Sequence, residues 1–237
     1  MKITHIYHSG FAVELTHCIL IFDWYKGVLP EFTKADTGRE KTYFVFASHA
    51  HGDHFNPSIF KLMQPGRTIH YILSNDIHAK ATDPAADICF VMPHKSYDID
   101  GIHVETLFST DLGVAFYIEA EGHTFYHAGD LNLWYWNGEP DRDNLWQIEH
   151  YHKEIDLLQG KKIEVAFLPL DSRLEEHGAD GVIYFMEHVG AEYVFPMHYW
   201  DDLDGSRAYL SQAELRPYRD AFHFEDCFLI PDSVSKR

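Results

Sequence analysis

The feature that most constrains this chain is a run of potential metal ligands directly after an apolar segment. Residues 43–47 read YFVFA, as buried strands do, and residues 48–54 read SHAHGDH. His49 and His51, two positions apart in a turn, direct two imidazoles to the same side, while Asp53 and His54 face a neighbouring position. The run predicts a site for two adjacent metal ions, with a single structural metal or a solvated loop as the alternatives.

Three other apolar segments also end in a potential ligand. Asp23 follows CILIF, Asp130 follows TFYHAG, and His198 follows YVFPM. Alone, an Asp after a strand is usually a turn residue or a helix cap. Together with the histidine run, they supply a carboxylate able to bridge two metals (Asp130), a further imidazole (His198) and an acid to orient the histidine loop from behind (Asp23). Their joint occurrence favours a dinuclear centre.

The remaining pattern predicts one domain over residues 1–237 in which helices pack on sheets. Further strands are expected at Lys2–Tyr7, Phe11–Leu15, Cys18–Phe22, Thr68–Leu73, Ile88–Met92, Ile102–Phe108, Val114–Glu119, Thr124–His127, Val165–Leu168 and Tyr193–Phe195. Helices are expected from Pro57, over Leu145–Leu158 and over Val182–Val189, and the capping box Ser211-x-x-Glu214 is expected to open another.

Charge and composition indicate which partners and which cellular compartment to expect. Lys and Arg number 19 against 37 Asp and Glu, a formal net charge of −18. This field repels polyanions, so we expect a small-molecule substrate and no long nucleic acid. No stretch approaches the roughly 20 apolar residues that a membrane span needs, and the start MKITHIYHSGF lacks the apolar run of a secretory signal. Three scattered cysteines favour a reducing compartment, so we expect a cytoplasmic protein without membrane association.

Four sequence runs resemble those of the metallo-β-lactamase-fold hydrolases, in particular the branch of bacterial ascorbate-6-phosphate lactonase-like proteins. They are SHAHGDH, HAGD at His127–Asp130, FPMHYW at Phe195–Trp200 and HSGF at His8–Phe11. The resemblance spans nearly the whole chain. It implies a single-domain α+β fold, a four-layer αββα sandwich, with a dinuclear metal site at the sheet edge.

The same resemblance implies a ligand set. His49 and His51 would bind one metal, Asp53, His54 and His198 the other, and Asp130 would bridge them.

One departure from the family concerns the first metal. The family supplies a third histidine just before the strand that leads to the GD motif, where this chain has FSTDLG over residues 108–113. We favour Asp111 as the replacement, with Ser109, Thr110 or water as alternatives. A carboxylate oxygen is a harder Lewis base than an imidazole nitrogen, so this position suits harder metal ions. We therefore expect two divalent ions, with Zn favoured and Mn or Fe as alternatives.

Two adjacent cations acidify a shared water and hold the oxyanion that forms when it attacks. The sequence therefore predicts a hydrolase that uses a metal-activated hydroxide on a small ester, lactone or phosphoester. Asp53 is the expected general base, and His177 and Tyr199 are the candidate acids for the leaving group. Arg173 is a candidate clamp for a carboxylate or phosphate.

Two other functions compete with this one. The first is a phosphodiesterase or nuclease of the same fold, which the absence of Lys and Arg clusters disfavours. The second is a metal-binding protein without hydrolytic turnover, in which the lost third histidine has weakened one site. Metal counting and an activity screen separate the three.

Overall fold

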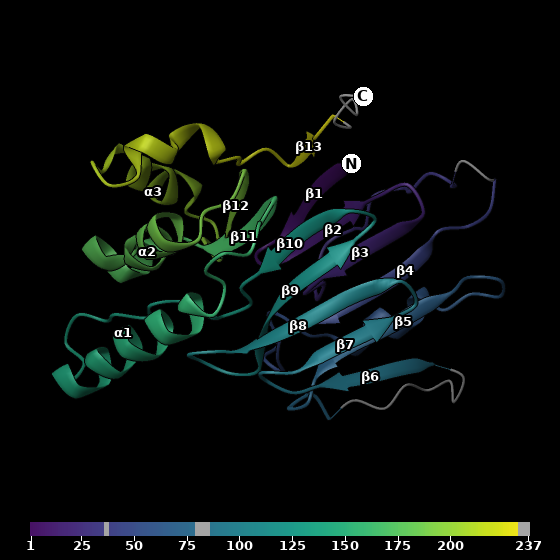
Figure 1. Ribbon diagram of the computed structural model, residues 1–237, viewed down its shortest axis with the longest axis horizontal. Coiled ribbons are helices and arrows are strands. Elements are labelled where there is room, and N and C mark those ends of the chain that lie inside the picture. The colour runs from purple at the N-terminus through teal and green to yellow at the C-terminus, as the bar shows by residue number, and fades with distance from the viewer. Residues whose placement is uncertain (36–37, 79–85, 232–237) are drawn as a thin grey trace.

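The computed structural model describes residues 1–35, 38–78 and 86–231. Two β-sheets pack face to face, and the α-helices lie together on one side of them (Figure 1). The strand order is β13-β1-β2-β3-β4-β5-β6 in the first sheet and β12-β11-β10-β9-β8-β7 in the second. The predicted α+β sandwich is confirmed.

The elements have the following bounds. The first sheet contains β1 (Lys2–Tyr7), β2 (Gly10–Glu14), β3 (Cys18–Phe22), β4 (Thr42–Ala47), β5 (Ile69–Ser74), β6 (Asp87–Val91) and β13 (Cys227–Leu229). The second contains β7 (Ser96–Ile99), β8 (Ile102–Phe108), β9 (Val114–Ala120), β10 (His123–His127), β11 (Val165–Pro169) and β12 (Tyr193–Met197). The α-helices are α1 (Asp141–Asp156), α2 (Asp180–His188) and α3 (Leu203–Ala208), and the 3-10 helices are η1 (Pro57–Leu62), η2 (Ser172–His177), η3 (Tyr209–Ser211) and η4 (Arg216–Ala221).

Central strands are apolar throughout because both of their faces are covered. In β3, Phe22 points into the space between the sheets, where its ring lies 5.6 Å from that of Phe167 in β11. Its neighbour Ile21 belongs to a separate apolar cluster that includes Ile59 of η1. Side chains alternate across a strand, so a strand buried on both faces reads as a continuous apolar run.

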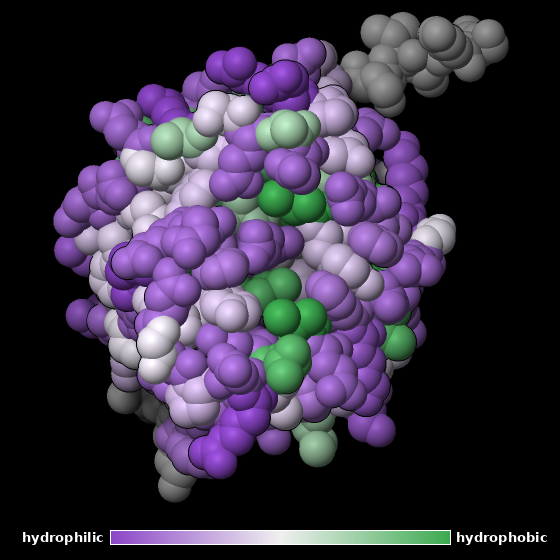
Figure 2. All heavy atoms as spheres, turned by 90° about the vertical axis from the view of Figure 1, so that its left-hand side faces the viewer, coloured by the Kyte–Doolittle hydropathy of each residue, from purple (hydrophilic) through white to green (hydrophobic). Residues whose placement is uncertain are grey.

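The outer layers differ in thickness. The helices α1 and α2 cover the second sheet, and Phe185 of α2 stacks on Tyr126 of β10 with ring centroids 5.2 Å apart. This helical side is largely hydrophilic, with a small group of apolar residues near its centre (Figure 2). On the first sheet the corresponding cover is η1, which Asn56 caps by accepting a hydrogen bond from the Ser58 amide.

That cover is a 3-10 helix of six residues, whereas an amphipathic helix was expected from Pro57. A turn at residues 64–67 stops it, because Pro65 disfavours helical backbone at Gln64.

The prediction of a helix that begins at the capping box Ser211-x-x-Glu214 is wrong. The Ser211 hydroxyl donates to the carbonyl of Ala208 and so completes the preceding turn, leaving no cap for a helix beyond it. The chain then forms only the 3-10 helix η4, in which Pro217 provides no amide hydrogen. The α-helix of this region, α3, lies earlier and is capped by Asp202. The short strands β7 and β13 were not predicted.

Strand direction brings the loops of interest to one edge of each sheet. In the first sheet β3, β4 and β5 are parallel, and β1 runs the same way because β2 is antiparallel to both β1 and β3. In the second sheet β10, β11 and β12 are parallel, and β8 runs with them because β9 is antiparallel to both β8 and β10. The carboxyl ends of these strands therefore share an edge, as in other sheets whose sites lie at parallel strand ends.

None of the helices within the described residues is long and apolar enough to cross a membrane.

Candidate metal centre

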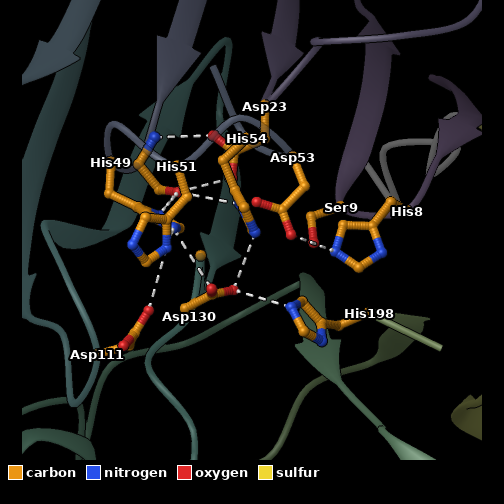
Figure 3. Close-up of polar contacts among 12 residues, drawn as sticks. His8, Ser9, Asp23, His49, His51, Asp53, His54, Asp111, Asp130 and His198 are labelled. Carbon is orange, nitrogen blue, oxygen red and sulfur yellow. Dashed lines mark hydrogen bonds and ion pairs between the residues drawn. The ribbon is translucent and has the colours of Figure 1, made fainter. Parts of the chain in front are cut away.

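A first cluster of ligands forms where β4, β8 and β10 end. It contains His49 and His51 from the histidine loop, Asp111 from the β8–β9 connection and Asp130 after β10. His51 Nδ1 lies 3.0 Å from His49 Nε2 and 3.4 Å from Asp111 Oδ2 (Figure 3). One ligand atom from each of the four lies within 4.8 Å of the others. Asp111, which we favoured in place of a third histidine, therefore lies in this cluster.

A second cluster lies beside the first and is more deeply buried. It contains Asp53 and His54 from the histidine loop, His198 after β12, and His8 from the turn between β1 and β2. His8, His54 and His198 are buried, and Asp53 is partly exposed. Its four ligand atoms also lie within 4.8 Å of one another.

Asp130 lies between the two clusters and faces both. Its Oδ2 is 3.4 Å from His49 Nε2. Its Oδ1 is 3.1 Å from His54 Nε2 and 3.5 Å from His198 Nε2. A carboxylate whose two oxygens face separate ligand groups has the geometry of a metal bridge.

Carboxylates and a hydroxyl fix the imidazoles from behind. His54 Nδ1 donates to Asp23 Oδ2 at 2.7 Å, and His198 Nδ1 donates to Asp171 Oδ2 at 2.9 Å. His49 Nδ1 lies 3.0 Å from the Ser48 hydroxyl. These bonds leave the Nε2 atoms directed at the gap between the clusters, which is the usual arrangement of metal-binding histidines.

The residues present fit a pair of metal ions. His54 Nε2 and Asp130 Oδ1 are buried and close, yet their geometry is not that of a hydrogen bond, and neither has another hydrogen-bond partner among the described residues. Buried polar atoms are normally satisfied, so donors grouped in this way suit a shared cation. The set of imidazoles and carboxylates is one that Zn, Mn and Fe accept.

The electrostatics favour the metal-binding state of His49 and Asp130, whereas His54 would have to lose a proton to bind a metal. Burial lowers the pKa of His49 to about 4, so its imidazole is neutral near neutral pH. Burial also acts to lower the pKa of His54, but the carboxylates of Asp130 and Asp23 outweigh it and raise that pKa. For Asp130, burial acts to raise the pKa, and His54, His198 and His49 together hold it well below its ordinary range. The bridging carboxylate is therefore ionised.

The cleft above the clusters is small and aromatic. Its volume is about 270 Å³, and its walls include Trp134, Trp136 and Trp200 besides the acidic ligands. Arg173 of η2 is the one cation among its lining residues. Asp171 holds this guanidinium by accepting from Nε at 2.9 Å, and the rings of Trp136 and Trp200 lie 5.7 Å and 5.3 Å from it.

The two candidate acids do not line this cleft. His177 packs on Tyr135 with ring centroids 4.0 Å apart, and its Nδ1 lies 2.8 Å from Asp180 Oδ2. The Tyr199 hydroxyl lies 3.1 Å from His5 Nδ1, and burial raises the pKa of Tyr199 to about 12. By contrast, Asp53, the expected general base, lines the cleft.

Two residues of the centre were not predicted as such. Asp171 was not singled out in the sequence, although it follows the strand β11 just as Asp130 follows β10. His8 was noted only within the HSGF run. Both residues follow strands whose carboxyl ends share one edge of the sandwich. They can be identified from this position only when the directions of the strands are known.

The sandwich and its strand-end clusters define a protein of the metallo-β-lactamase fold. The structure matches Igni18, a metallo hydrolase from the archaeon Ignicoccus hospitalis, with a TM-score of 0.66 and 18% identity over 97% of this chain and 99% of that one. It matches the metallo-β-lactamase fold protein YhfI from Bacillus subtilis with a TM-score of 0.58 and 12% identity over 93% and 94% of the two chains.

Sequence comparison identifies more specific relatives. A UPF0173 metal-dependent hydrolase from Alkaliphilus metalliredigens is 24% identical over 219 residues, covering 84% of this chain and 85% of the relative. Another, from Korarchaeum cryptofilum, is 25% identical over 205 residues, covering 84% and 83%. No family model matches the chain. The structural matches confirm the fold that the resemblance implies, and the sequence relatives are named metal-dependent hydrolases; the lactonase-like branch stays a prediction.

Proposed function

We propose that this chain is a metal-dependent hydrolase in which two divalent ions act on a small ester, lactone or phosphoester. The observation that carries the proposal is Asp130, whose two carboxylate oxygens face different ligand clusters at 3.1 to 3.5 Å. The names of the UPF0173 relatives support the activity class. The small volume of the cleft, about 270 Å³, supports a small-molecule substrate.

The ligands divide between two positions. His49, His51 and Asp111 would hold the first ion, Asp53, His54 and His198 the second, and Asp130 would contact both. Bound divalent ions supply Lewis-acid polarisation and make water acidic enough to react near neutral pH. Zn suits both positions, and the two carboxylates of the first position also suit Mn or Fe.

The chain's own groups would do the rest. Asp53, partly open to the cleft with 29% of its side chain exposed, would orient the attacking water and accept its proton. The tryptophans would exclude bulk water from the substrate. We assign no leaving-group role to His177 or Tyr199, because both rings are engaged outside the cleft.

Arg173 would recognise an acidic group on the substrate. Its guanidinium reaches the cleft while Asp171 holds it by Nε and Nη2, so Nη1 is directed away from that carboxylate. A fixed guanidinium suits a carboxylate or a phosphate oxygen.

The experiment that tests this function combines metal counting with turnover. The purified protein is stripped, reloaded with Zn, Mn or Fe, and assayed on panels of esters, lactones, phosphomonoesters and phosphodiesters. We expect two bound equivalents per chain and hydrolysis of at least one small substrate class. His51→Ala should lose metal and at least about 100-fold in activity while keeping its fold, because half of the His51 side chain is solvent-exposed. His17→Ala, an exposed turn residue, serves as the control.

The alternatives give different results. Cleavage of long nucleic acid in preference to small substrates would favour a nuclease. One equivalent of metal and no turnover on any panel would favour a metal-binding protein without catalysis, and full activity of His51→Ala would contradict the proposal.

A further inference from the structure

His8 is an unexplained histidine inside the centre. Its side chain is 0% exposed, and among the residues that the structure describes neither Nδ1 nor Nε2 has a hydrogen-bond partner. A buried polar group without a partner destabilises the fold. An apolar side chain would fill the same space without this destabilisation. The presence of an imidazole at this buried position therefore needs an explanation.

The turn that carries His8 is held from several directions. Its carbonyl lies 3.1 Å from His5 Nε2, and the next carbonyl, of Ser9, lies 3.0 Å from His127 Nε2. At Gly10 a Cβ would come within 3.0 Å of the Tyr7 carbonyl oxygen. His8 itself has a φ of 57°, an unusual backbone conformation for a residue with a side chain. Such conformations persist where surrounding contacts impose them, often at functional sites.

The ring is directed into the second cluster (Figure 3). Its centroid is 4.3 Å from that of His198 and 5.6 Å from that of His54. Its Nε2 is 3.6 Å from Asp53 Oδ2, too far for a hydrogen bond but close to the roughly 3.4 Å that separates two atoms bound tetrahedrally to one ion.

We infer that His8 is a ligand of the second metal ion, in addition to Asp53, His54 and His198, with Asp130 shared between the two ions. This inference rests on the two-metal centre of the proposed function. It makes the two positions unequal, with three imidazoles at the second and two at the first. The second ion is then the more nitrogen-rich and the more enclosed, and coordination sites for substrate lie mainly on the first.

The test is the substitution His8→Gly followed by chemical rescue. Glycine adopts a φ of 57° without strain, so the variant removes the ring and leaves the turn conformation available. The wild type and the variant are loaded with Co²⁺, and the bound equivalents, the dissociation constants and the visible absorption spectrum of the cobalt are measured. We expect one of the two equivalents to bind at least about 10-fold more weakly in the variant. Added imidazole, which fits the vacated space, should restore both its affinity and its spectrum.

The control is His17→Gly, which removes an exposed imidazole from a turn and should change nothing. Unchanged cobalt binding and an unchanged spectrum in His8→Gly would overturn the inference. A loss of binding that imidazole does not reverse would also overturn it, since this marks a structural role. If the wild type itself binds no metal, the proposed function is wrong. If the wild type binds metal and His8→Gly binds it equally well, only the assignment of His8 as a ligand is wrong.

Discussion

At the scale of residues, the two proposed metal positions differ in exposure. The side chains of His51 and Asp111 are 52% and 44% exposed, whereas those of His54 and His198 are 0% and 7% exposed. Substitution of an exposed ligand removes little packed surface, so its effect on metal binding can be measured without loss of the fold. The first position is therefore the better one for testing ligand roles by mutation.

Asp111→Ala should lower occupancy of the first position and leave the second loaded, because Asp111 approaches only the His51 side of the centre. Metal content measured after dialysis should fall from two equivalents towards one. Asp111→His is the matched variant, since it supplies the third imidazole that the resemblance implies; it should keep both ions and strengthen the preference for Zn over Mn and Fe. Unchanged metal content in Asp111→Ala would show that Asp111 is only a turn residue and not a metal ligand.

Arg173→Gln should raise KM for substrates that carry a carboxylate or phosphate by at least about 10-fold, while kcat/KM for neutral esters changes little. The reason is that Arg173 is the one cation lining the cleft. Kinetics on pairs of charged and neutral substrates measure this. Arg142→Gln is the control, because the Arg142 side chain is 85% exposed on α1. Equal losses on both kinds of substrate would mean that Arg173 acts only by holding Asp171.

At the scale of elements, the loops of the two sheets fit closely together. The β8–β9 connection, which carries Asp111, packs against the start of the histidine loop, and the Val114 amide donates to the Ser48 carbonyl at 3.0 Å. Gly113 makes this contact possible. Its φ is +72°, and a Cβ there would overlap the Ser48 carbonyl and lie 2.6 Å from His49 Cβ. Metal geometry therefore depends on a residue that carries no ligand atom.

Gly113→Ala should displace the histidine loop, lower metal affinity and destabilise the fold by about 3 kcal/mol. Chemical denaturation of the metal-free protein and metal titration measure the two effects. Gly101→Ala is the matched control, since its φ is +88° but a Cβ there meets nothing within 4 Å. It should show only the cost of the left-handed backbone, and equal effects of the two variants would contradict the role of the contact.

Local patterns were sufficient for some parts of the site and not for others. His49–His54 could be predicted because the ligands are neighbours in sequence, and Asp130 and His198 because each follows an apolar strand. Asp171 has the same local signal as Asp130, since it too follows an apolar strand. His8 could not be predicted, because its proximity to the centre depends on which strands run parallel. The helix expected at Ser211 failed for a related reason, since the same capping residue also completes a preceding turn.

At the scale of the whole molecule, a buried ion pair lies away from the metal edge. Glu14 ends β2, and its carboxylate accepts from Lys41 Nζ at 2.8 Å and from the Thr33 amide at 2.7 Å. Lys41 also donates to the Leu15 carbonyl. Burial acts to raise the pKa of Glu14, but these partners outweigh it and lower the pKa below the ordinary value of 4.5. The pair ties the segment after β3 to the sheet.

The stability that Glu14 contributes should be fully present above pH 4.5 and lost as pH falls through its lowered pKa. The difference in unfolding free energy between the metal-free wild type and Glu14→Gln should therefore shrink towards acid. Lys41→Met should cost about 3–5 kcal/mol near neutral pH, because it leaves a buried carboxylate without its cation. Lys34→Met, in an exposed pair with Glu40, should cost much less. A pH-independent difference between wild type and Glu14→Gln would argue against the lowered pKa.

The ligands of the two proposed metal positions are spread over sequence ranges of very different length. The ligands of the first lie between His49 and Asp130, whereas those of the second extend to His198 and, on our assignment, back to His8. A nascent chain on the ribosome thus carries every ligand of the first position while the segment beyond Asp130 still awaits translation. The second position can be completed only after His198 has emerged, so under the proposed function its ion would be acquired late in synthesis.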